Sequence, residues 1–243
     1  MLDQSPLRSV RLDPGRVPDP AGFPFELPAV AALAEGLAFH PQLTCLVGEN
    51  GSGKSTIVEA IAAKLDLDAE GGDAHLTFVT RAAESPLHEA LVLSRGARWP
   101  AMRYFLRAES FYNVARDIDA LGGPRLAAHG GRELHRMSHG ESFLTLALER
   151  WVPDGVYILD EPEAALSPQG CLSLLRRIRE LALDGAQFVL ATHSPILMAY
   201  PDAFIYELGD RGVSRVAYED TDHYRITRSF LENPQGFLHH LFS

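Results

Sequence analysis

The chain of 243 residues contains a glycine-rich octapeptide made of Gly48, Glu49, Asn50, Gly51, Ser52, Gly53, Lys54 and Ser55. This octapeptide matches the pattern G-x-x-x-x-G-K-S/T. An apolar run at 43–47 precedes it, and apolar residues at helical spacing follow from Thr56 to position 65. The pattern predicts a buried strand, a tight loop and a helix. Glycines at a helix N-terminus let several backbone N–H groups converge on one anion without Cβ clashes, so we predict an α/β fold with a phosphate-binding loop.

Two side chains complete this loop. Lys54 supplies a positive charge for the outer phosphates of a nucleotide, and the Ser55 hydroxyl can hold the Mg²⁺ that arrives with it. Of the 22 Lys and Arg residues only two are lysines, Lys54 and Lys64, so a lysine fills the one position where a compact ammonium suits a phosphate. A glycine-rich turn without a ligand is the weaker alternative. We therefore predict that 48–55, together with Thr56, binds ATP with Mg²⁺.

A second apolar run, at 156–159, ends in two acidic residues, Asp160 and Glu161. Ligands of parallel α/β sheets bind at the carboxyl ends of the strands, so both carboxylates are expected beside the loop. We predict that Asp160 holds Mg²⁺ directly or through water, and that Glu161 polarises the attacking water. A strand followed by acids is weak evidence alone, but it becomes strong together with an upstream phosphate loop.

A histidine is expected at the same edge of the sheet. The apolar segment 187–191 predicts a strand, and His193 follows it by two residues. Its side chain should therefore emerge near Asp160. A purely structural histidine is the weaker alternative at this position.

A further anion-binding segment is predicted before the second acidic strand. Ser138 and Gly140 precede an expected helix at 143–151, and Glu141 follows them directly. Serine and glycine favour a helix N-terminus, where free N–H groups and the helix dipole attract anions. We therefore group Ser138, Gly140 and Glu141 with the nucleotide-binding residues.

The composition and net charge of the chain argue against some classes of protein and favour a single domain. A formal charge of −10 argues against a general nucleic-acid coat or a membrane-surface binder, and an apolar content of 46% suits a single domain over 1–243. Eight arginines and four acids lie between 95 and 136, which leaves an anion-facing patch and an ordinary solvated surface as open alternatives. Cys45 and Cys171 lack paired or metal-ligand spacing, which indicates buried thiols. With no run near 18 apolar residues, we predict a cytoplasmic protein without direct membrane insertion.

Five segments, in this order, resemble the motif series of the ABC-type ATPases. They are the Walker A loop at 48–55, the signature at 138–141, Walker B at 158–162, the D-loop at 163–167 and the H-loop at His193. The resemblance extends from about 23 to 208. It implies an α/β fold of the P-loop NTPase type, with an ABC-ATPase-like mixed sheet, flanking helices and a small signature-bearing helical lobe inserted at approximately 95–150.

The resemblance also implies a mechanism. Two copies would face each other head to tail, with each ATP held between the Lys54 loop of one copy and the Ser138 and Gly140 segment of the other. Glu161 would be the general base, and His193 would contact the γ-phosphate. Lys54, Glu161 and His193 are thus the expected catalytic residues of a homodimer with ATP at its interface.

The chain departs from transporter ATPases at several positions. His139 and Glu141 stand where glycine and glutamine are usual, and Ser167 stands where aspartate is common. No glutamine marks a Q-loop, and Glu109 lies nearest to its expected place. The Ser-Pro pair after His193 is similar to the RecF-like and SMC-like ATPases and to the predicted stand-alone AAA-type ATPases grouped near them.

Two functions fit this pattern. The favoured one is an ATPase whose ATP-driven dimer acts on an unknown cytosolic partner, with a nucleic acid as one candidate, in DNA maintenance or defence. The alternative is the ATP-binding subunit of an ABC transporter. A scaffold that binds nucleotide without hydrolysis is hard to reconcile with Glu161. Phe23 and Phe25 are candidates for stacking on adenine, although packing in the core is the favoured interpretation for both.

Overall fold

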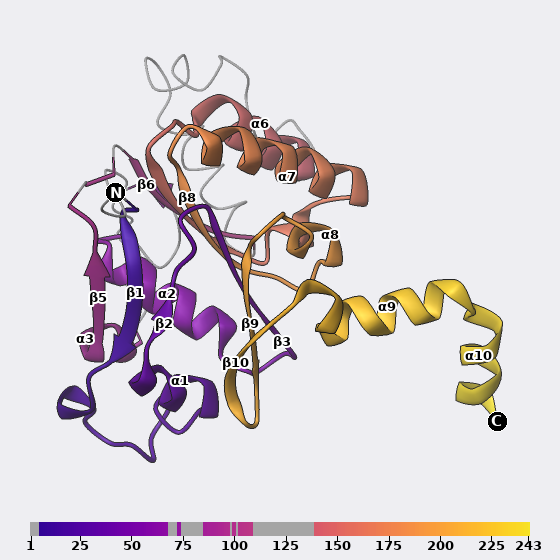
Figure 1. The fold of residues 1–243 in the computed structure, drawn as a ribbon, viewed down its shortest axis with the longest axis horizontal. Coiled ribbons are helices and arrows are strands. Elements are labelled where there is room, and N and C mark those ends of the chain that lie inside the picture. The colour runs from indigo at the N-terminus through magenta and orange to yellow at the C-terminus, as the bar shows by residue number, and fades with distance from the viewer. Residues whose placement is uncertain (1–4, 68–71, 74–84, 98, 101, 109–138) are drawn as a thin grey trace.

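The computed structural model describes residues 5–67, 72–73, 85–97, 99–100, 102–108 and 139–243 (Figure 1). These residues form a seven-stranded central sheet and a three-stranded sheet beside it. The strand expected at 75–81, the helix expected at 110–120, and the residues Glu109 and Ser138 lie outside the described ranges.

The central sheet has the strand order β10-β9-β3-β8-β7-β6-β4. Its strands are β3 (Leu43–Gly48), β4 (Gly72–Asp73), β6 (Met102–Arg107), β7 (Gly155–Asp160), β8 (Gln187–Ala191), β9 (Phe204–Gly209) and β10 (Gly212–Val216). The five inner strands are parallel, whereas β4 and β10 pair antiparallel at the two edges. Every residue of β3, β7 and β8 is buried, as expected for parallel strands covered on both faces. The mixed α/β sheet predicted from the sequence is therefore confirmed.

The smaller sheet is antiparallel, with the order β2-β1-β5. Its strands are β1 (Leu7–Leu12), β2 (Leu37–Ala38) and β5 (Leu91–Arg95), and short helices lie around it: η1 (Pro14–Arg16), α1 (Pro28–Ala32), η2 (Leu33–Glu35) and α3 (Leu87–Ala90). Gln187, at the start of β8, joins the two sheets. Its side-chain Nε2 donates to the carbonyl oxygens of Leu7 and His40, at 2.8 and 2.9 Å, and its Oε1 accepts from the Leu7 N–H at 2.8 Å.

Helices cover both faces of the central sheet (Figure 1). The long helices are α2 (Lys54–Lys64), α6 (His139–Arg150) and α7 (Pro168–Leu183). Alternate residues of a strand point to opposite faces, and β3 shows this directly. Cys45 and Val47 pack in the same core as Leu174 of α7, whereas Leu46 packs in the second core with Ile57 of α2.

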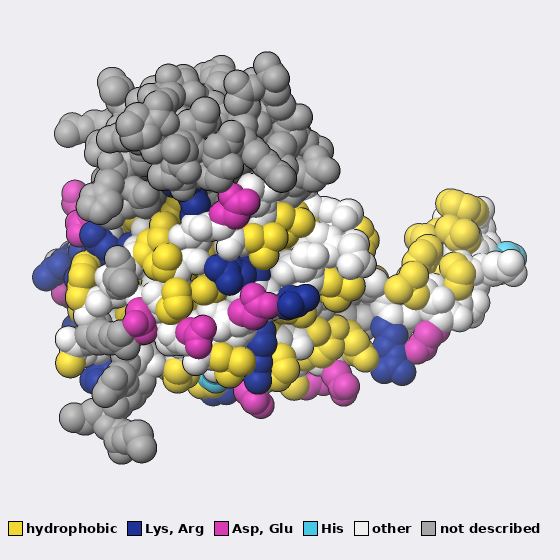
Figure 2. Space-filling model, turned by 90° about the horizontal axis from the view of Figure 1, so that it is seen from above, with side chains coloured by type: hydrophobic (Ala, Val, Ile, Leu, Met, Phe, Trp, Pro, Cys, Tyr) yellow, Lys and Arg dark blue, Asp and Glu magenta, His cyan; other side chains and the backbone are white. Residues whose placement is uncertain are grey.

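The chain ends in a pair of helices that extends away from the sheets (Figure 1). The last elements are η4 (Pro162–Ala165), α8 (Pro195–Met198), η5 (Tyr218–Asp220), α9 (Asp222–Glu232) and α10 (Pro234–Phe242). We call residues 222–242 the C-terminal arm. Apolar side chains are exposed along it, as Figure 2 shows, and they include Ile226, Leu231, Leu241 and Phe242. No helix in the described ranges combines the length and the apolar character needed to cross a bilayer.

Several predicted boundaries agree with the structure, and others differ. The sequence predicts strands at 7–12 and 187–191 and a helix at 168–183, and β1, β8 and α7 have these bounds. Helix α2 begins at Lys54, two residues before the expected start. However, α6 begins at His139 and not at 143, so Gly140 and Glu141 lie in its first turn instead of before it. The expected start was placed at the first apolar residue, whereas the first turn of a helix is often polar because its N–H groups lack partners within the helix.

The expectations for the two phenylalanines and for the segment at about 95–150 agree with the structure only in part. Phe25 is buried, at 5% exposure, but Phe23 is 65% exposed, so core packing is confirmed for the first and wrong for the second. Strand β6 lies in the central sheet, although its residues fall within the lobe expected at about 95–150. Cys45 and Cys171 are free and buried, as expected, and burial raises the pKa of both thiols.

Candidate active site

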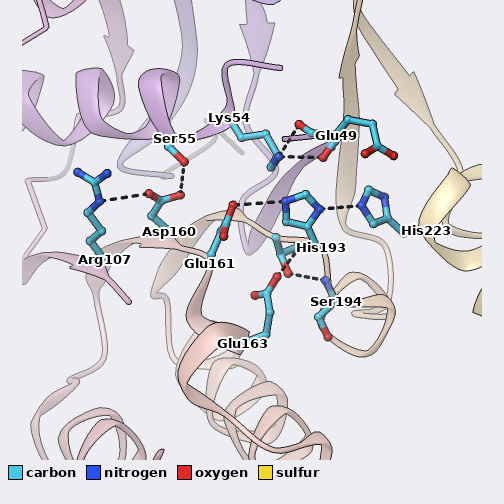
Figure 3. Close-up of polar contacts among 12 residues, drawn as sticks. Glu49, Lys54, Ser55, Arg107, Asp160, Glu161, Glu163, His193, Ser194 and His223 are labelled. Carbon is cyan, nitrogen blue, oxygen red and sulfur yellow. Dashed lines mark hydrogen bonds and ion pairs between the residues drawn. The ribbon is translucent and has the colours of Figure 1, made fainter. Parts of the chain in front are cut away.

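The order of the central strands brings the predicted motifs to one edge of the sheet. Strand β8 lies between β3 and β7, and Ala191 of β8 is in register with both Leu46 of β3 and Asp160 of β7. The loop after β3, the acids at the end of β7 and the histidine after β8 therefore leave the sheet side by side (Figure 3).

The loop between β3 and α2 has the backbone expected of an anion cradle. Gly48 has φ +144°, and a Cβ at this position would come within 2.3 Å of the Leu208 carbonyl oxygen, so the loop can pass β9 only with glycine. Gly53 precedes α2 in a left-handed conformation, and no side chain caps the first N–H groups of this helix. Ser52 Oγ is buried and has no hydrogen-bond partner among the described residues. Free backbone donors and an unsatisfied hydroxyl fit a polyphosphate ligand.

Lys54 is held against the loop that precedes it. Its ammonium group donates to the carbonyl oxygens of Gly48 at 2.8 Å and Glu49 at 3.0 Å, and the residue is only 3% exposed. Burial lowers the pKa of Lys54, and the carboxylates of Glu161 and Asp160 nearby act in the opposite direction. The side chain thus places a buried positive charge at the loop, and both of these hydrogen bonds go to neutral carbonyl groups.

Ser55 and Asp160 come together across the site. Ser55 Oγ donates to Asp160 Oδ1 at 3.1 Å, and Asp160 is 4% exposed. Burial raises the pKa of the Asp160 carboxyl to about 7, although the Ser55 hydrogen bond and the Arg107 guanidinium, with its Nε 4.0 Å from Oδ2, both act to lower it. Arg107 is itself paired with Glu59 at 2.8 Å. A hydroxyl and a buried carboxylate are hard oxygen donors, so this pair fits Mg²⁺, whose charge would offset the burial of the carboxylate.

Glu161 adopts a strained backbone conformation. Its φ of 48° and ψ of 49° place it in the left-handed region, which costs an L side chain on the order of 1 kcal/mol. Its N–H donates to the Ala191 carbonyl oxygen at 2.9 Å, which anchors the turn to β8. The carboxylate remains 38% exposed, and its Oε1 lies 3.3 Å from His193 Nε2. The turn therefore directs this carboxylate away from Asp160 and toward the loop and the histidine.

His193 lies at the centre of a chain of polar contacts (Figure 3). One ring nitrogen, Nε2, faces Glu161, and the other, Nδ1, is hydrogen-bonded to His223 Nε2 at 2.9 Å. The Glu163 carboxylate accepts a hydrogen bond from the His193 backbone N–H. Burial and the charge of Lys54 lower the pKa of His193, which favours a neutral imidazole.

The structure brings together most, but not all, of the predicted site residues. The loop 48–55, Asp160, Glu161 and His193 share one edge of the sheet (Figure 3). Thr56 follows in α2, Gly140 and Glu141 lie in the first turn of α6, and Ser138 is outside the described residues. In the part of the chain that the structure describes, no cluster of three or more His, Cys, Asp or Glu residues forms a metal site without a nucleotide.

Sequence reasoning did not identify three of the residues that line this site. Glu163 was recognised only as part of the D-loop, although it holds the backbone of His193. Arg107 was seen as one of many arginines, yet it lies beside Asp160. His223 is 30 residues from His193 in sequence and has no local pattern that distinguishes it. Only the folded path of the chain reveals these contacts.

Two family models match parts of the chain. An AAA-domain model matches residues 33–74, and a second AAA-domain model, whose description refers to the AbiEii toxin of a type IV toxin–antitoxin system, matches residues 130–199. The two matches contain the Walker A loop and the segment from the signature to His193. They confirm the resemblance to ATPases of the ABC and AAA type that the motif series indicated.

Curated relatives are similar over most of this chain but are much longer. The ribose import ATP-binding protein RbsA 1 of Rhizobium meliloti is 31% identical over 194 residues, which cover 71% of this chain and 38% of that protein. ABC transporter G family member 11 of Arabidopsis thaliana is 29% identical over 202 residues, which cover 74% of this chain and 28% of that protein. The matched part of the chain thus spans between about a quarter and two fifths of the length of these two relatives.

Solved structures with a related arrangement include an SMC head domain from Thermotoga maritima. It has 16% sequence identity and a TM-score of 0.39, and the match covers 74% of this chain and 92% of the SMC head. A nucleotide-free ATP-binding cassette from an ABC transporter has 15% identity and a TM-score of 0.45, with 80% of this chain and 87% of the cassette covered.

Proposed function

We propose that this chain binds ATP with Mg²⁺ and hydrolyses it, as one subunit of a head-to-tail dimer that forms when ATP is bound. The observation that carries the proposal is the position of β8 between β3 and β7. This order assembles a phosphate loop, an oxygen pair suited to Mg²⁺, a carboxylate and a neutral histidine at one sheet edge. These are the parts that phosphoryl transfer to water requires.

The loop and Lys54 would bind the phosphates. The free N–H groups at the start of α2 point toward an incoming anion, and the Lys54 ammonium can exchange the carbonyl oxygens of Gly48 and Glu49 for phosphate oxygens. Ser55 and Asp160 would hold Mg²⁺, which when bound neutralises charge on the phosphates. Its arrival favours the ionised form of Asp160, which burial otherwise disfavours.

Glu161 would act as the general base. A water oxygen attacks the γ-phosphorus, the bond to the β–γ bridging oxygen breaks, and the water proton passes to the Glu161 carboxylate. The left-handed turn at Glu161 keeps this carboxylate partly exposed and separate from the buried Asp160. His193 restrains it on one side, because His193 Nε2 faces Glu161 Oε1. The base is thus held close to the loop without being buried.

A second copy would complete the site. Helix α6, whose first turn contains Gly140 and Glu141, packs with α7 and η4 of its own subunit. A helix start of this kind attracts phosphate oxygens, so the partner's signature segment is the proposed cover. The target of the dimer is proposed to be a cytosolic macromolecule, with a nucleic acid as one candidate. The names of the two curated relatives favour a second candidate, the ATP-binding subunit of a transporter.

Paired measurements of ATP binding and phosphate release test the proposal. Glu161→Gln should retain binding but lose roughly 10²-fold or more in turnover, because the amide keeps the shape but cannot accept the proton. Glu35→Gln, an exposed carboxylate in η2, is the matched control and should hydrolyse ATP at the wild-type rate. Wild-type turnover by Glu161→Gln would show that another group activates the water.

Capture from the native cells distinguishes the two candidate targets. Glu161→Gln with ATP should accumulate in the closed dimer and retain its target. Recovery of a membrane complex would support the transporter subunit, whereas recovery of nucleic acid or of a protein without membrane segments would support the favoured function.

A further inference from the structure

The first turn of α9 contributes a second histidine to the site. His223 is the second residue of this helix, and its Nε2 lies 2.9 Å from His193 Nδ1. The ring centroids are 5.0 Å apart and the ring planes are inclined by 56° (Figure 3). The two rings therefore meet nitrogen to nitrogen, in a hydrogen bond and not in a stack.

His223 is held firmly, although the arm to which it belongs extends outward. Thr221 is fully buried, and its Oγ1 accepts from the Tyr224 N–H at 3.3 Å and donates to the Tyr218 carbonyl oxygen at 2.8 Å. The N–H of Asp222 donates to the Glu207 carboxylate on β9 at 3.3 Å. The start of α9 is thus capped by Thr221 and joined to β9 through Asp222, the residue before His223.

The contacts assign a proton position to each ring. Glu161 Oε1 lies 3.3 Å from His193 Nε2, which is buried and makes no hydrogen bond within the described residues. An ionised carboxylate only accepts, so the favourable place for the His193 proton is Nε2, where it faces Glu161. Nδ1 is then an acceptor, and His223 Nε2 must be the donor. His223 Nδ1 is left as a buried acceptor without a partner among the described residues, which is the less costly choice because unpaired donors are rarer than unpaired acceptors.

We propose that His223 is a positioning residue for the reaction: its ring N–H fixes His193 in the tautomer that presents Nε2–H to Glu161, so that α9 must be docked for efficient turnover. This inference rests on the proposed function. If the donor is lost, the His193 proton can move to Nδ1, and the bare Nε2 lone pair then faces the Glu161 carboxylate. The carboxylate would lose its restraint, whereas the hydrogen bonds from Lys54 to the Gly48 and Glu49 carbonyl oxygens do not involve His223 and should persist.

Matched substitutions separate the donor from the volume of the side chain. His223→Leu removes the donor, and His223→Gln restores an N–H at a similar distance from Cβ. His240→Leu, an exposed histidine near the end of the same arm, is the control. His223→Phe, which keeps a ring but no donor, serves if the leucine variant does not fold.

The tautomer can be read without nucleotide by correlating the ring protons and ¹⁵N nuclei of labelled histidines, with the His193 signals identified by their loss in His193→Ala. We expect a protonated Nε2 and a bare Nδ1 in the wild type, in His223→Gln and in His240→Leu. In His223→Leu a substantial population should carry the proton on Nδ1. An unchanged His193 tautomer in His223→Leu and His223→Phe would overturn the inference, whatever the activity of the protein.

Turnover gives a second, independent reading. Partners that orient a functional histidine typically contribute about ten- to a hundredfold to activity, so His223→Leu should lower kcat by roughly tenfold or more with little change in KM. His223→Gln should recover most of this loss, and His223→Leu should have no further effect in a His193→Ala background. Equal kcat values for His223→Leu and His223→Gln would contradict the positioning role of His223. Additive losses of kcat in the variant that combines His193→Ala with His223→Leu would also contradict it. A wild-type protein that does not hydrolyse ATP would refute the proposed function, while the tautomer still decides the role of His223.

Discussion

The carboxyl group of Asp160 should destabilise the nucleotide-free protein, and its removal should relieve that cost. Asp160 is 4% exposed, and burial raises its pKa from 3.8 to about 7 against the opposing effects of Ser55 and Arg107. The variant Asp160→Asn keeps an oxygen that can accept from Ser55 Oγ and removes the ionisable group. We expect this variant to unfold at higher urea concentration than the wild type at alkaline pH, although it should bind Mg·ATP more weakly.

The direction and size of the effect follow from linkage. The folded pKa is raised, so the stabilising contribution of the protonated carboxyl is complete below about pH 4 and is lost as the pH rises through about 7. The difference between 3.8 and about 7 corresponds to about 4 kcal/mol of unfolding free energy as an upper limit. The same relation gives a penalty of about 3 kcal/mol at pH 6, so the advantage of Asp160→Asn should fall by roughly 1 to 2 kcal/mol between pH 8.5 and pH 6.

Urea unfolding followed by tryptophan fluorescence provides the assay, because Trp151 is buried in the core below α7. Both pH values lie above the isoelectric point near 5.4, where precipitation would interfere. Asp184→Asn, at an exposed carboxylate after α7, is the control and should show no pH-dependent gain. The reasoning fails if Asp160→Asn is no more stable than the wild type at pH 8.5, or if its advantage does not depend on pH.

Three further outcomes follow from the structure. Lys54→Ala should abolish ATP binding at millimolar nucleotide, and a calorimetric titration with unchanged affinity would exclude this loop as the phosphate site. Glu161→Gln should be dimeric with ATP and monomeric with ADP, so light scattering that reports a monomer with ATP would count against the shared site. Gln187→Leu should lower the free energy of unfolding by about 2 to 4 kcal/mol, because polar groups of Leu7 and His40 lose their partners; denaturant midpoints equal to the wild type would contradict this.

The parts of the site that local sequence predicted are those fixed by short-range chemistry. Gly48 must be a glycine because the Leu208 backbone lies too close for a Cβ. Asp160 is the last residue of the apolar strand β7, so it lies at the carboxyl edge of the sheet whichever strands flank β7. The boundaries of β8 and α7 could likewise be placed from the sequence. The structure adds that Ser167 caps α7 by accepting from the Gly170 N–H.

The parts that sequence could not predict depend on how distant segments meet. The position of β8 between β3 and β7 is a result of the connections in space, and it places His193 beside Glu161 (Figure 3). His223 reaches the site because β9 and β10 return the chain to the sheet before α9 begins. No periodicity in 222–232 distinguishes this histidine from an ordinary residue of a polar first turn.

Three costly features of the nucleotide-free protein lie together at one edge of the sheet. Ser52 Oγ is buried without a partner in the described residues, Asp160 is a buried carboxyl, and Glu161 occupies the left-handed region. A bound polyphosphate with its dication can reduce the first two costs. Phosphate oxygens can accept from Ser52 Oγ, and the positive charge of the dication can offset the burial of the Asp160 carboxylate. The backbone strain at Glu161 holds its carboxylate toward the bound phosphates. Because the ligand binds the folded state, it should raise the free energy of unfolding, by about 2.7 kcal/mol at a ligand concentration a hundred times Kd. Because these three features lie where β3, β8 and β7 end, we expect the fold to gain stability when the site is filled. We expect the same coupling to link nucleotide binding to the docking of α9, whose His223 contacts His193 at this edge.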